Sequence, residues 1–215
     1  TSVTWGHTRD TLGLTHNEFD KTYYVAGLVS SVDSPEGTNK NGFKTVIRGI
    51  KNVNGTYEVS EIIPTLGGLE NSITDITSIQ SIQENGDFII GGFTMDDEIE
   101  VAHAGNFSGS DNGYLARVSK EGDLIWIAGY GPTNSSESLF DFEISDNKIV
   151  AAYESGNGFA LIYYDLETGR DYSSKTNIPG RIQDIEILNN EVYVLNYLDS
   201  GNDNWSSKIS KYSLD

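Results

Sequence analysis

The clearest structural signal in this chain is the stretch Asn85-Gly86-Asp87-Phe88-Ile89-Ile90-Gly91-Gly92-Phe93-Thr94. It opens with an Asn-Gly pair and continues as a short apolar run rich in β-branched and aromatic residues, which is typical of a β-strand. Asn-Gly accepts the positive φ angles that a two-residue hairpin turn requires. We therefore expect a second strand directly before the turn, and the stretch predicts a β-hairpin.

The same pattern of a polar turn followed by an apolar strand occurs four times. The turns are Asp20-Lys21, Asn85-Gly86, Asp146-Asn147 and Asn189-Asn190. After each second strand comes a loop of variable length, and then a third strand that opens near residues 41–43, 112–114, 157–159 and 204–206. A further tight turn leads to a fourth strand in the first three repeats. No segment shows a helical period, so the repeats predict an all-β chain.

Four-stranded repeats of this size are typical of β-propeller blades, with an ordinary β-sandwich as the alternative. We expect one domain over residues 1–215, a small β-propeller of four four-stranded antiparallel blades. The last repeat ends before its fourth strand, and residues 1–6 have the pattern of the missing strand, so we expect the N-terminal strand to close the last blade. The predicted blades cover approximately residues 15–63, 76–129, 139–175, and 182–215 plus 1–6.

Residues 85–94 and 112–126 resemble the repeats of bacterial β-propeller proteins, whose blades carry a strand of the type Gly-Asp-x-x-aliphatic-Gly-Gly-x-Thr. The likeness is best over residues 78–131 and fades in the third and fourth repeats. It implies a propeller fold and a secreted or cell-surface setting, with the periplasm as the alternative. It implies no particular reaction, because propellers carry many functions. The four repeats either close alone or belong to a longer ring.

Composition excludes several classes of function. The chain has 215 residues, 14 Lys plus Arg against 32 Asp plus Glu, and a net charge of −18. So acidic a surface repels nucleic acid, which we therefore do not expect as a partner. The absence of cysteine excludes disulfides and thiol nucleophiles. No apolar run approaches the length of a membrane span, so we expect no membrane insertion.

The predicted topology also indicates where a ligand would bind. In a four-stranded antiparallel blade, the connection between strands two and three and the connection to the next blade leave the same end of the sheet. These connections are the long ones in this sequence, for example near residues 29–40, 94–111 and 131–138. Long loops at one end of a rigid scaffold are the usual place for binding, so we expect the functional surface there. Insertions that are merely tolerated at that end are the alternative.

The longest loop carries the candidate metal ligands Asp96, Asp97 and Glu98. Several carboxylates in a short irregular segment suit Ca²⁺, which takes six to eight oxygen ligands in flexible geometry. No segment fits the calcium-loop pattern D-x-[DN]-x-[DN]-G, so a solvated acidic loop is the alternative. Calcium is the one cofactor that the sequence suggests.

Four further residues are candidates for ligand contact. His7 and His103 lie in two loops predicted at the same end, and Asp111 follows His103 in the longest loop. A histidine beside a carboxylate can bind a metal or transfer a proton. Trp205 breaks the register of the aromatic residues that recur at one repeat position and are expected to share one buried environment, namely Phe43, Tyr114 and Phe159.

These observations favour a non-catalytic ligand-binding or adhesion module that binds a glycan or protein ligand through the long-loop end. The first alternative is a carbohydrate-active enzyme, a hydrolase or lyase, that uses loop carboxylates. The second is a scaffold for protein interactions. No nucleophile elbow, phosphate-binding loop or zinc-protease motif is present in the sequence.

Overall fold

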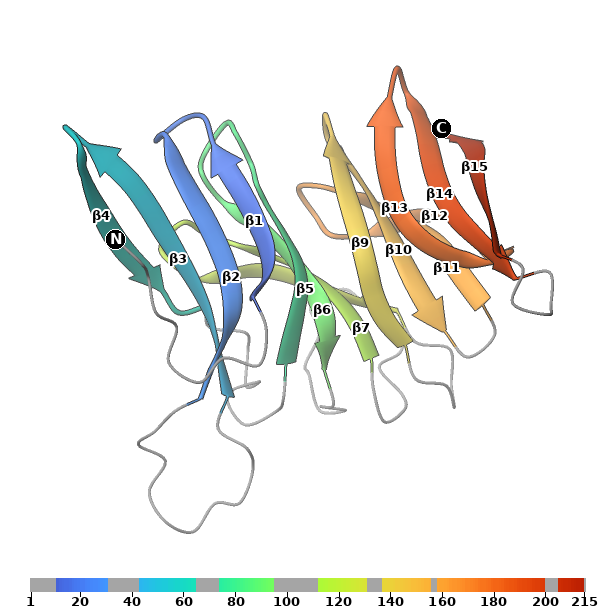
Figure 1. Cartoon of the computed structure of the whole chain (residues 1–215), viewed down its shortest axis with the longest axis horizontal. Helices are drawn as coiled ribbons and strands as arrows, with labels where there is room; N and C mark the ends of the chain where they lie inside the picture. The colour runs from blue at the N-terminus through green and yellow to red at the C-terminus, as the bar shows by residue number, and fades with distance from the viewer. Residues whose placement is uncertain are drawn as a thin grey trace, which may run out of the picture.

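The computed structural model describes residues 11–30, 43–64, 74–94, 112–130, 137–155, 158–199 and 205–214. Within these ranges every regular element is a β-strand and no helix occurs, which confirms the all-β prediction. The strands form four antiparallel sheets, and each sheet is built from strands that are consecutive in the sequence (Figure 1).

Each of the four sheets consists of three or four strands. The first sheet holds β1 (Thr11–Asn17), β2 (Thr22–Ser30), β3 (Phe43–Val53) and β4 (Thr56–Ile62). The second holds β5 (Thr74–Ser81), β6 (Phe88–Thr94), β7 (Asn112–Val118) and β8 (Leu124–Tyr130). The third holds β9 (Glu137–Ser145), β10 (Lys148–Ser155), β11 (Gly158–Asp165) and β12 (Asp171–Ile178). The fourth holds β13 (Arg181–Leu188), β14 (Glu191–Asp199) and β15 (Trp205–Ser213).

Two of the turns adopt the backbone conformations that two-residue hairpins require, whereas the turn at Asn85-Gly86 is longer than predicted: β5 ends at Ser81, β6 begins at Phe88, and of the pair only Gly86 has a positive φ, at 84°. Asn54 and Gly55 between β3 and β4 both have positive φ, at 53° and 84°. The same is true of Asn189 and Asn190 between β13 and β14, at 52° and 63°. Two successive positive φ angles match the right-handed twist of the flanking strands. These local sequences therefore define the hairpins.

The four sheets stand side by side in chain order (Figure 1). The first strand of each sheet contacts the first strand of the next, so β1, β5, β9 and β13 form a line of inner strands. The row is not closed into a ring, and the first and fourth sheets are its two ends. The all-β part of the predicted fold is thus confirmed, whereas the propeller arrangement is not. Residues 1–6, which we expect to complete the last blade, lie outside the described residues.

Each sheet has a forward face, directed toward the next sheet in the chain, and a backward face, directed toward the preceding one. Alternate residues of a strand point to opposite faces. In β6, Ile89 points forward and Phe88 and Ile90 point backward, and all three are fully buried. The second and third sheets are therefore apolar on both faces, and three cores fill the spaces between the four sheets.

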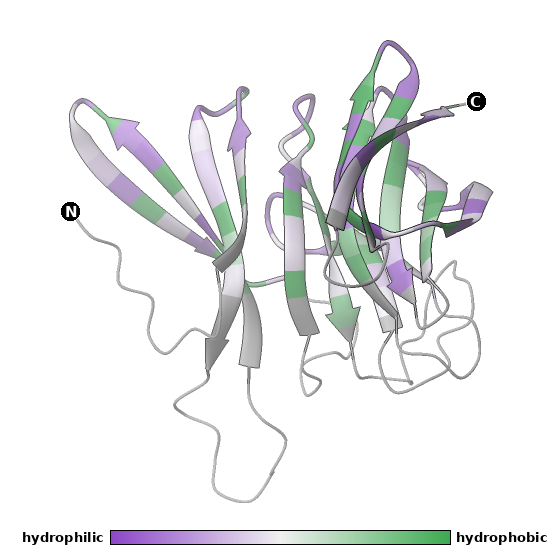
Figure 2. Cartoon of the chain, turned by 45° about the vertical axis from the view of Figure 1, so that its right-hand side comes forward, coloured by the Kyte–Doolittle hydropathy of each residue, from purple (hydrophilic) through white to green (hydrophobic). Residues whose placement is uncertain are grey.

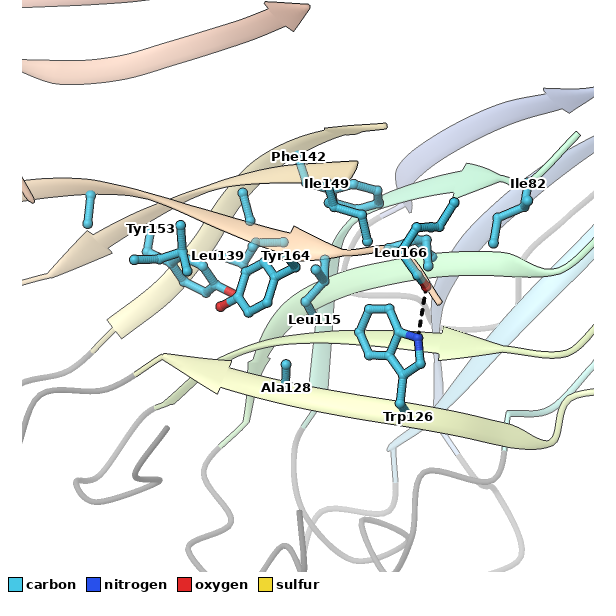
Figure 3. Packing of buried hydrophobic residues seen from close by; sticks show 14 residues of the cluster. Ile82, Leu115, Trp126, Ala128, Leu139, Phe142, Ile149, Tyr153, Tyr164 and Leu166 are labelled. Carbon is cyan, nitrogen blue, oxygen red and sulfur yellow. Dashed lines mark hydrogen bonds between the residues drawn. The ribbon is translucent and has the colours of Figure 1, made fainter. Parts of the chain in front are cut away.

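The core between the second and third sheets illustrates how close this packing is (Figure 3). Trp126 of β8 donates a hydrogen bond from Nε1 to the backbone oxygen of Leu166, at 3.1 Å. Gly91 of β6 lies directly against Leu139 of β9, where an added Cβ would overlap the leucine side chain. Gly91 therefore allows close packing between the second and third sheets.

The recurring aromatic position proved less uniform than the sequence predicts. Tyr114 and Phe159 are both buried, but Tyr114 packs between the first and second sheets and Phe159 between the third and fourth. Tyr114 points backward and Phe159 points forward, so they do not share one environment. A displacement of one residue along a strand exchanges its faces, and the Asn-Gly pattern does not determine that displacement.

Candidate functional site

The four inner strands share a structural irregularity at the same repeat position. Each carries a β-bulge, after which the ladder to the second strand of its sheet resumes. A bulge inserts one extra residue and redirects the side chain that follows it. The residues directly after the four bulges are Gly13, Ser78, Asp141 and Asp184. They are therefore equivalent positions on neighbouring strands.

The inner strands contact one another through polar side chains. Ser81 of β5 donates its backbone N–H to Oγ1 of Thr15 in β1, at 3.2 Å. Ser78 of β5 donates from Oγ to Oδ1 of Asp141 in β9, at 3.3 Å, and Gln80 donates from Nε2 to the backbone oxygen of Phe142, at 3.0 Å. The sheets are thus joined along the inner strands by a polar seam and farther out by apolar cores.

The seam is neutral along β1 and β5 and acidic along β9 and β13. Asp141 and Glu143 of β9 and Asp184 and Glu186 of β13 occupy equivalent positions on neighbouring strands. We call these four residues the inner-strand carboxyl cluster. The two carboxyl groups on β9 are partly buried, whereas those on β13 are exposed.

Burial determines how the cluster titrates. It raises the pKa of Asp141 to about 6, although hydrogen bonds from the Phe142 N–H and Ser78 act against the rise and the Asp184 carboxylate adds to it. Burial likewise raises the pKa of Glu143 to about 7, opposed by a hydrogen bond from Gln80 and assisted by the charge of Glu186. Removal from water disfavours the charged form of a carboxyl group. Both groups therefore change protonation near neutral pH.

Such carboxyl groups have two chemical uses. A carboxyl that titrates near neutrality can donate or accept a proton, or it can bind a cationic group once it is ionised. Asp141 and Glu143 are two residues apart on one strand, which places their Cα atoms about 7 Å apart. Within the described ranges no group of three or more His, Asp or Glu residues is arranged to hold a metal ion.

Most of the residues that the sequence singled out lie outside the part of the chain that the structure describes. These are His7, Asp96, Asp97, Glu98, His103 and Asp111. Their predicted roles remain predictions. Trp205 is the first residue of β15, where it is the pairing partner of Asp199 at the end of β14.

The described strand ends do locate the connections that carry these residues. β2 ends at Ser30 and β3 begins at Phe43, while β6 ends at Thr94 and β7 begins at Asn112. Because the strands are antiparallel, these connections and those between sheets leave one end of the row, which also has the short connections from β10 to β11 and from β12 to β13 (Figure 1). The turns that follow the first strand of each sheet lie at the other end. We call the first the long-connection end.

A surface hollow lies at the opposite, tight-turn end of the third sheet, lined by Asp165, Thr168, Arg170, Asp171 and Tyr172. Thr168 donates from both its hydroxyl and its backbone N–H to Oδ1 of Asp165, and the hydroxyl is the main cause of that carboxyl's lowered pKa. The Asp165 carboxylate is therefore engaged in forming the turn. This arrangement accounts for the acidic residue without a ligand.

Sequence reasoning missed the inner-strand carboxyl cluster, although a signal for it exists. Asp141-Phe142-Glu143-Ile144 and Asp184-Ile185-Glu186-Ile187 repeat one pattern of acidic and apolar residues. In each, the carboxylates alternate with a side chain that enters a core. Their equivalence becomes evident only when the bulges align the strands.

Comparison with known proteins supports the fold alone. No family model and no curated protein matches this chain. Among solved structures, it is similar to the computationally designed Ika4 protein, with a TM-score of 0.53 and 11% identity over 99% of this chain and 96% of that one. It is also similar to hydrazine synthase of Kuenenia stuttgartiensis, with a TM-score of 0.56 and 6% identity over 100% of this chain and 66% of that one. The described residues contain no helix long and apolar enough to span a membrane.

Proposed function

We propose that this chain is a non-catalytic ligand-binding or adhesion module of a secreted or cell-surface bacterial protein. The observation that carries the proposal is the asymmetry of the row of sheets, because residues 31–42, 65–73 and 95–111 all connect strands at one end. A rigid scaffold that presents variable segments at one end is suited to binding a glycan or a protein. The acidic charge of the chain favours ligands that are neutral or cationic.

We also propose that the four sheets are blades of a β-propeller. The shared position of the bulges and the contacts between neighbouring inner strands support this, since equivalent strands then line one axis. In this arrangement residues 1–6 add a fourth strand beside β15. Deleting residues 1–6 should lower the melting temperature by several degrees. An unchanged melting temperature would exclude this role for the N-terminal segment.

Ligand binding is tested with the whole chain on a glycan array and, in parallel, on a panel of extracellular-matrix proteins. We expect His103→Ala and Asp111→Ala to reduce the signal at least tenfold without a change in melting temperature. Glu121→Ala, an exposed acidic residue in a tight turn at the opposite end, is the matched control. Equal loss of binding in all three variants would contradict the assignment to the long-connection end.

Calcium binding is a separate part of the proposal and rests on Asp96, Asp97 and Glu98. Millimolar Ca²⁺ should raise the melting temperature of the native chain, because an ion that binds only the folded state stabilises that state. The double variant Asp96→Asn, Asp97→Asn should lose that increase. No response of the native chain to Ca²⁺ would remove the metal from the proposal.

One observation favours carbohydrate hydrolysis as a second candidate function. The pKa values of Asp141 and Glu143, raised by burial, place an acid and a base near neutral pH within one strand. Release of reducing sugar from a polysaccharide panel, abolished in Glu143→Gln, would establish this function. The inner-strand position differs from the loop carboxylates that the sequence suggested for such an enzyme.

A further inference from the structure

The two ends of the row expose residues of the kind that are buried everywhere else between sheets. The residue that follows each bulge by one position points backward in all four sheets. Ile79, Phe142 and Ile185 occupy this position in the second, third and fourth sheets and are at most 2% exposed. Leu14, the equivalent residue of the first sheet, is 66% exposed. Its side chain has the character of a core residue without a neighbouring sheet.

The rest of the first sheet's backward face carries further apolar residues together with the ion pair between Arg48 and Glu61, which lies in the same row as Leu14. Leu14 is paired with Val25, and Tyr23 and Ile50 lie in the next row across the sheet. Tyr57 and Val59 of β4 complete the face, and each is more than half exposed. Alternating apolar residues run along the strands of this end sheet (Figure 2). We call this surface the backward end face.

At the other end of the row, the fourth sheet exposes its forward face. Tyr193 and Leu195 of β14 are equivalent in register to Ile89 and Gly91 of β6, which pack forward onto the third sheet. Ile209 of β15 pairs with Leu195 and is 69% exposed, and Leu188 and Tyr197 lie on the same face. This face also carries the carboxylates of Asp184 and Glu186 and the ion pair between Lys211 and Glu191, whose Nζ and Oε1 atoms are 2.8 Å apart. We call this surface the forward end face.

We propose that a second copy of this chain covers both end faces, with the forward end face of each copy packed on the backward end face of the other. Each contact repeats the packing already present between the first and second, second and third, and third and fourth sheets. A two-fold axis makes two such contacts and closes the assembly, so no apolar face is left to extend it.

The polar seam continues across the same contact. Gly13 lies against Ile79 of the next sheet, where an added Cβ would be 2.7 Å from Cγ2 of the isoleucine. The equivalent pair across the dimer contact is Asp184 with Leu14 of the second copy. Glu186 then lies beside His16 of that copy, a side chain that is 30% exposed in the single chain and whose Nδ1 is 3.1 Å from Oε1 of Glu18. The acidic part of the seam thus meets a histidine.

The area of the two contacts is sufficient for a stable dimer. A face of three or four strands about 4.8 Å apart and seven residues long covers on the order of 400 Å². Two contacts, counted on both partners, bury roughly 1,600 Å², which is the size of a standard specific interface.

The first test is the mass of the chain in solution, measured by light scattering during size-exclusion chromatography. We expect twice the 23.6 kDa of one chain at micromolar concentration. Ile209→Glu and Leu14→Glu should each shift the mass to that of one chain. Phe19→Glu, at a turn residue that is also 69% exposed but lies on neither end face, should leave the dimer intact. A monomeric native chain, or a series of larger open assemblies, would overturn the proposal.

The second test uses the absence of natural cysteine. Asp184→Cys and Leu14→Cys chains, mixed and oxidised, should form a disulfide-linked pair, whereas neither variant should form one alone. The double variant in a single chain separates the alternatives: linkage between chains supports the dimer, and an internal disulfide at the mass of one chain would show that the first and fourth sheets close on each other. The result is independent of whether the chain binds a glycan, a protein or calcium.

Discussion

The two middle sheets and the two end sheets are built from the same repeat, but their surroundings differ. Phe88 and Ile149 point backward from the middle sheets and are fully buried, whereas the equivalent Tyr23 of the first sheet is 53% exposed. The two middle sheets are thus apolar on both faces, whereas the outer face of each end sheet carries apolar residues beside an ion pair. The position of a sheet in the row determines which of its faces are covered. The same side chain contributes very different free energies of folding in the two settings.

We expect the largest difference between middle and end sheets in the free energy of unfolding that is lost when an ion pair is broken. Arg117 in the middle of the row is buried, and its Nε and Nη2 both donate to Oδ2 of Asp87, at 3.2 and 3.0 Å. Arg117→Met should lower the free energy of unfolding by about 3–5 kcal/mol, because Asp87 is left as a buried unpaired charge. Arg48→Met, beside the more exposed Glu61 of the first sheet, should cost less than about 1 kcal/mol. Urea denaturation measures both at concentrations where the chain is monomeric, because Arg48 lies on the backward end face. Similar losses would contradict the comparison.

The next largest difference is expected in the free energy of unfolding that is lost when an apolar side chain is shortened to alanine. Ile79→Ala should cost about 2–5 kcal/mol, because the cavity lies in the closed core between the first and second sheets. Leu14→Ala, at the equivalent position of the end sheet, should cost less than about 1 kcal/mol when measured on the single chain. The measurement is chemical denaturation at concentrations where the chain is monomeric. A loss at Leu14 as large as at Ile79 would show that its face is covered within one chain.

Adding a side-chain atom, instead of removing one, tests the same difference between middle and end sheets at Gly91. Gly91→Ala places a methyl group against Leu139 and should cost about 1–3 kcal/mol through overpacking. The added change Leu139→Ala should make the Gly91 substitution nearly neutral, which a double-mutant cycle measures. The equivalent position of the end sheet is Leu195, a large side chain on a face with no further sheet of the same chain beyond it. A full cost of Gly91→Ala in the Leu139→Ala background would argue against the contact as its cause.

The smallest expected effect depends on pH. The folded-state pKa values of Asp141 and Glu143, about 6 and about 7, lie above the ordinary values of 3.8 and 4.5. The folded chain then binds more protons than the unfolded chain in this window, so the contribution of these groups is complete below pH ~4 and falls as pH rises to ~7. After allowance for solvent screening, Asp141→Asn should stabilise the chain by about 1 kcal/mol at pH 8 and by nearly nothing at pH 4.

Melting curves of the native and Asp141→Asn chains at the two pH values check this expectation. Asp184→Asn is the matched control, because its carboxyl is exposed and lies at the equivalent position of the end sheet. A stabilisation of equal size at pH 4 and pH 8 would show that burial of the charge is not the reason. An equal effect in both variants would show that the third and fourth sheets do not differ in this respect.

Much of the fold is predictable because its determinants are local. Asn54-Gly55 and Asn189-Asn190 specify tight hairpins through the φ angles that these residues tolerate, and the apolar alternation beside them predicts strands. The candidate site is predictable only in part. The order of the antiparallel strands predicts which end of the row carries the long connections. It does not predict the carboxyl cluster, because the cluster depends on bulges in β9 and β13 that no turn residue indicates.

Turns, strands and the division into four sheets were thus inherent in the amino-acid order, since each depends on residues that are close along the chain. Tertiary structure alone determined which face of each strand is buried and which carboxyl groups lose water. Phe142 and Leu14 show why: both follow a bulge by one residue and both point backward, yet one is fully buried and the other is 66% exposed. Burial depends on what lies opposite a side chain. That neighbour is distant along the chain, by 40 residues for Trp126 and Leu166 and by 62 for Thr77 and Leu139, or, as we propose, belongs to a second copy.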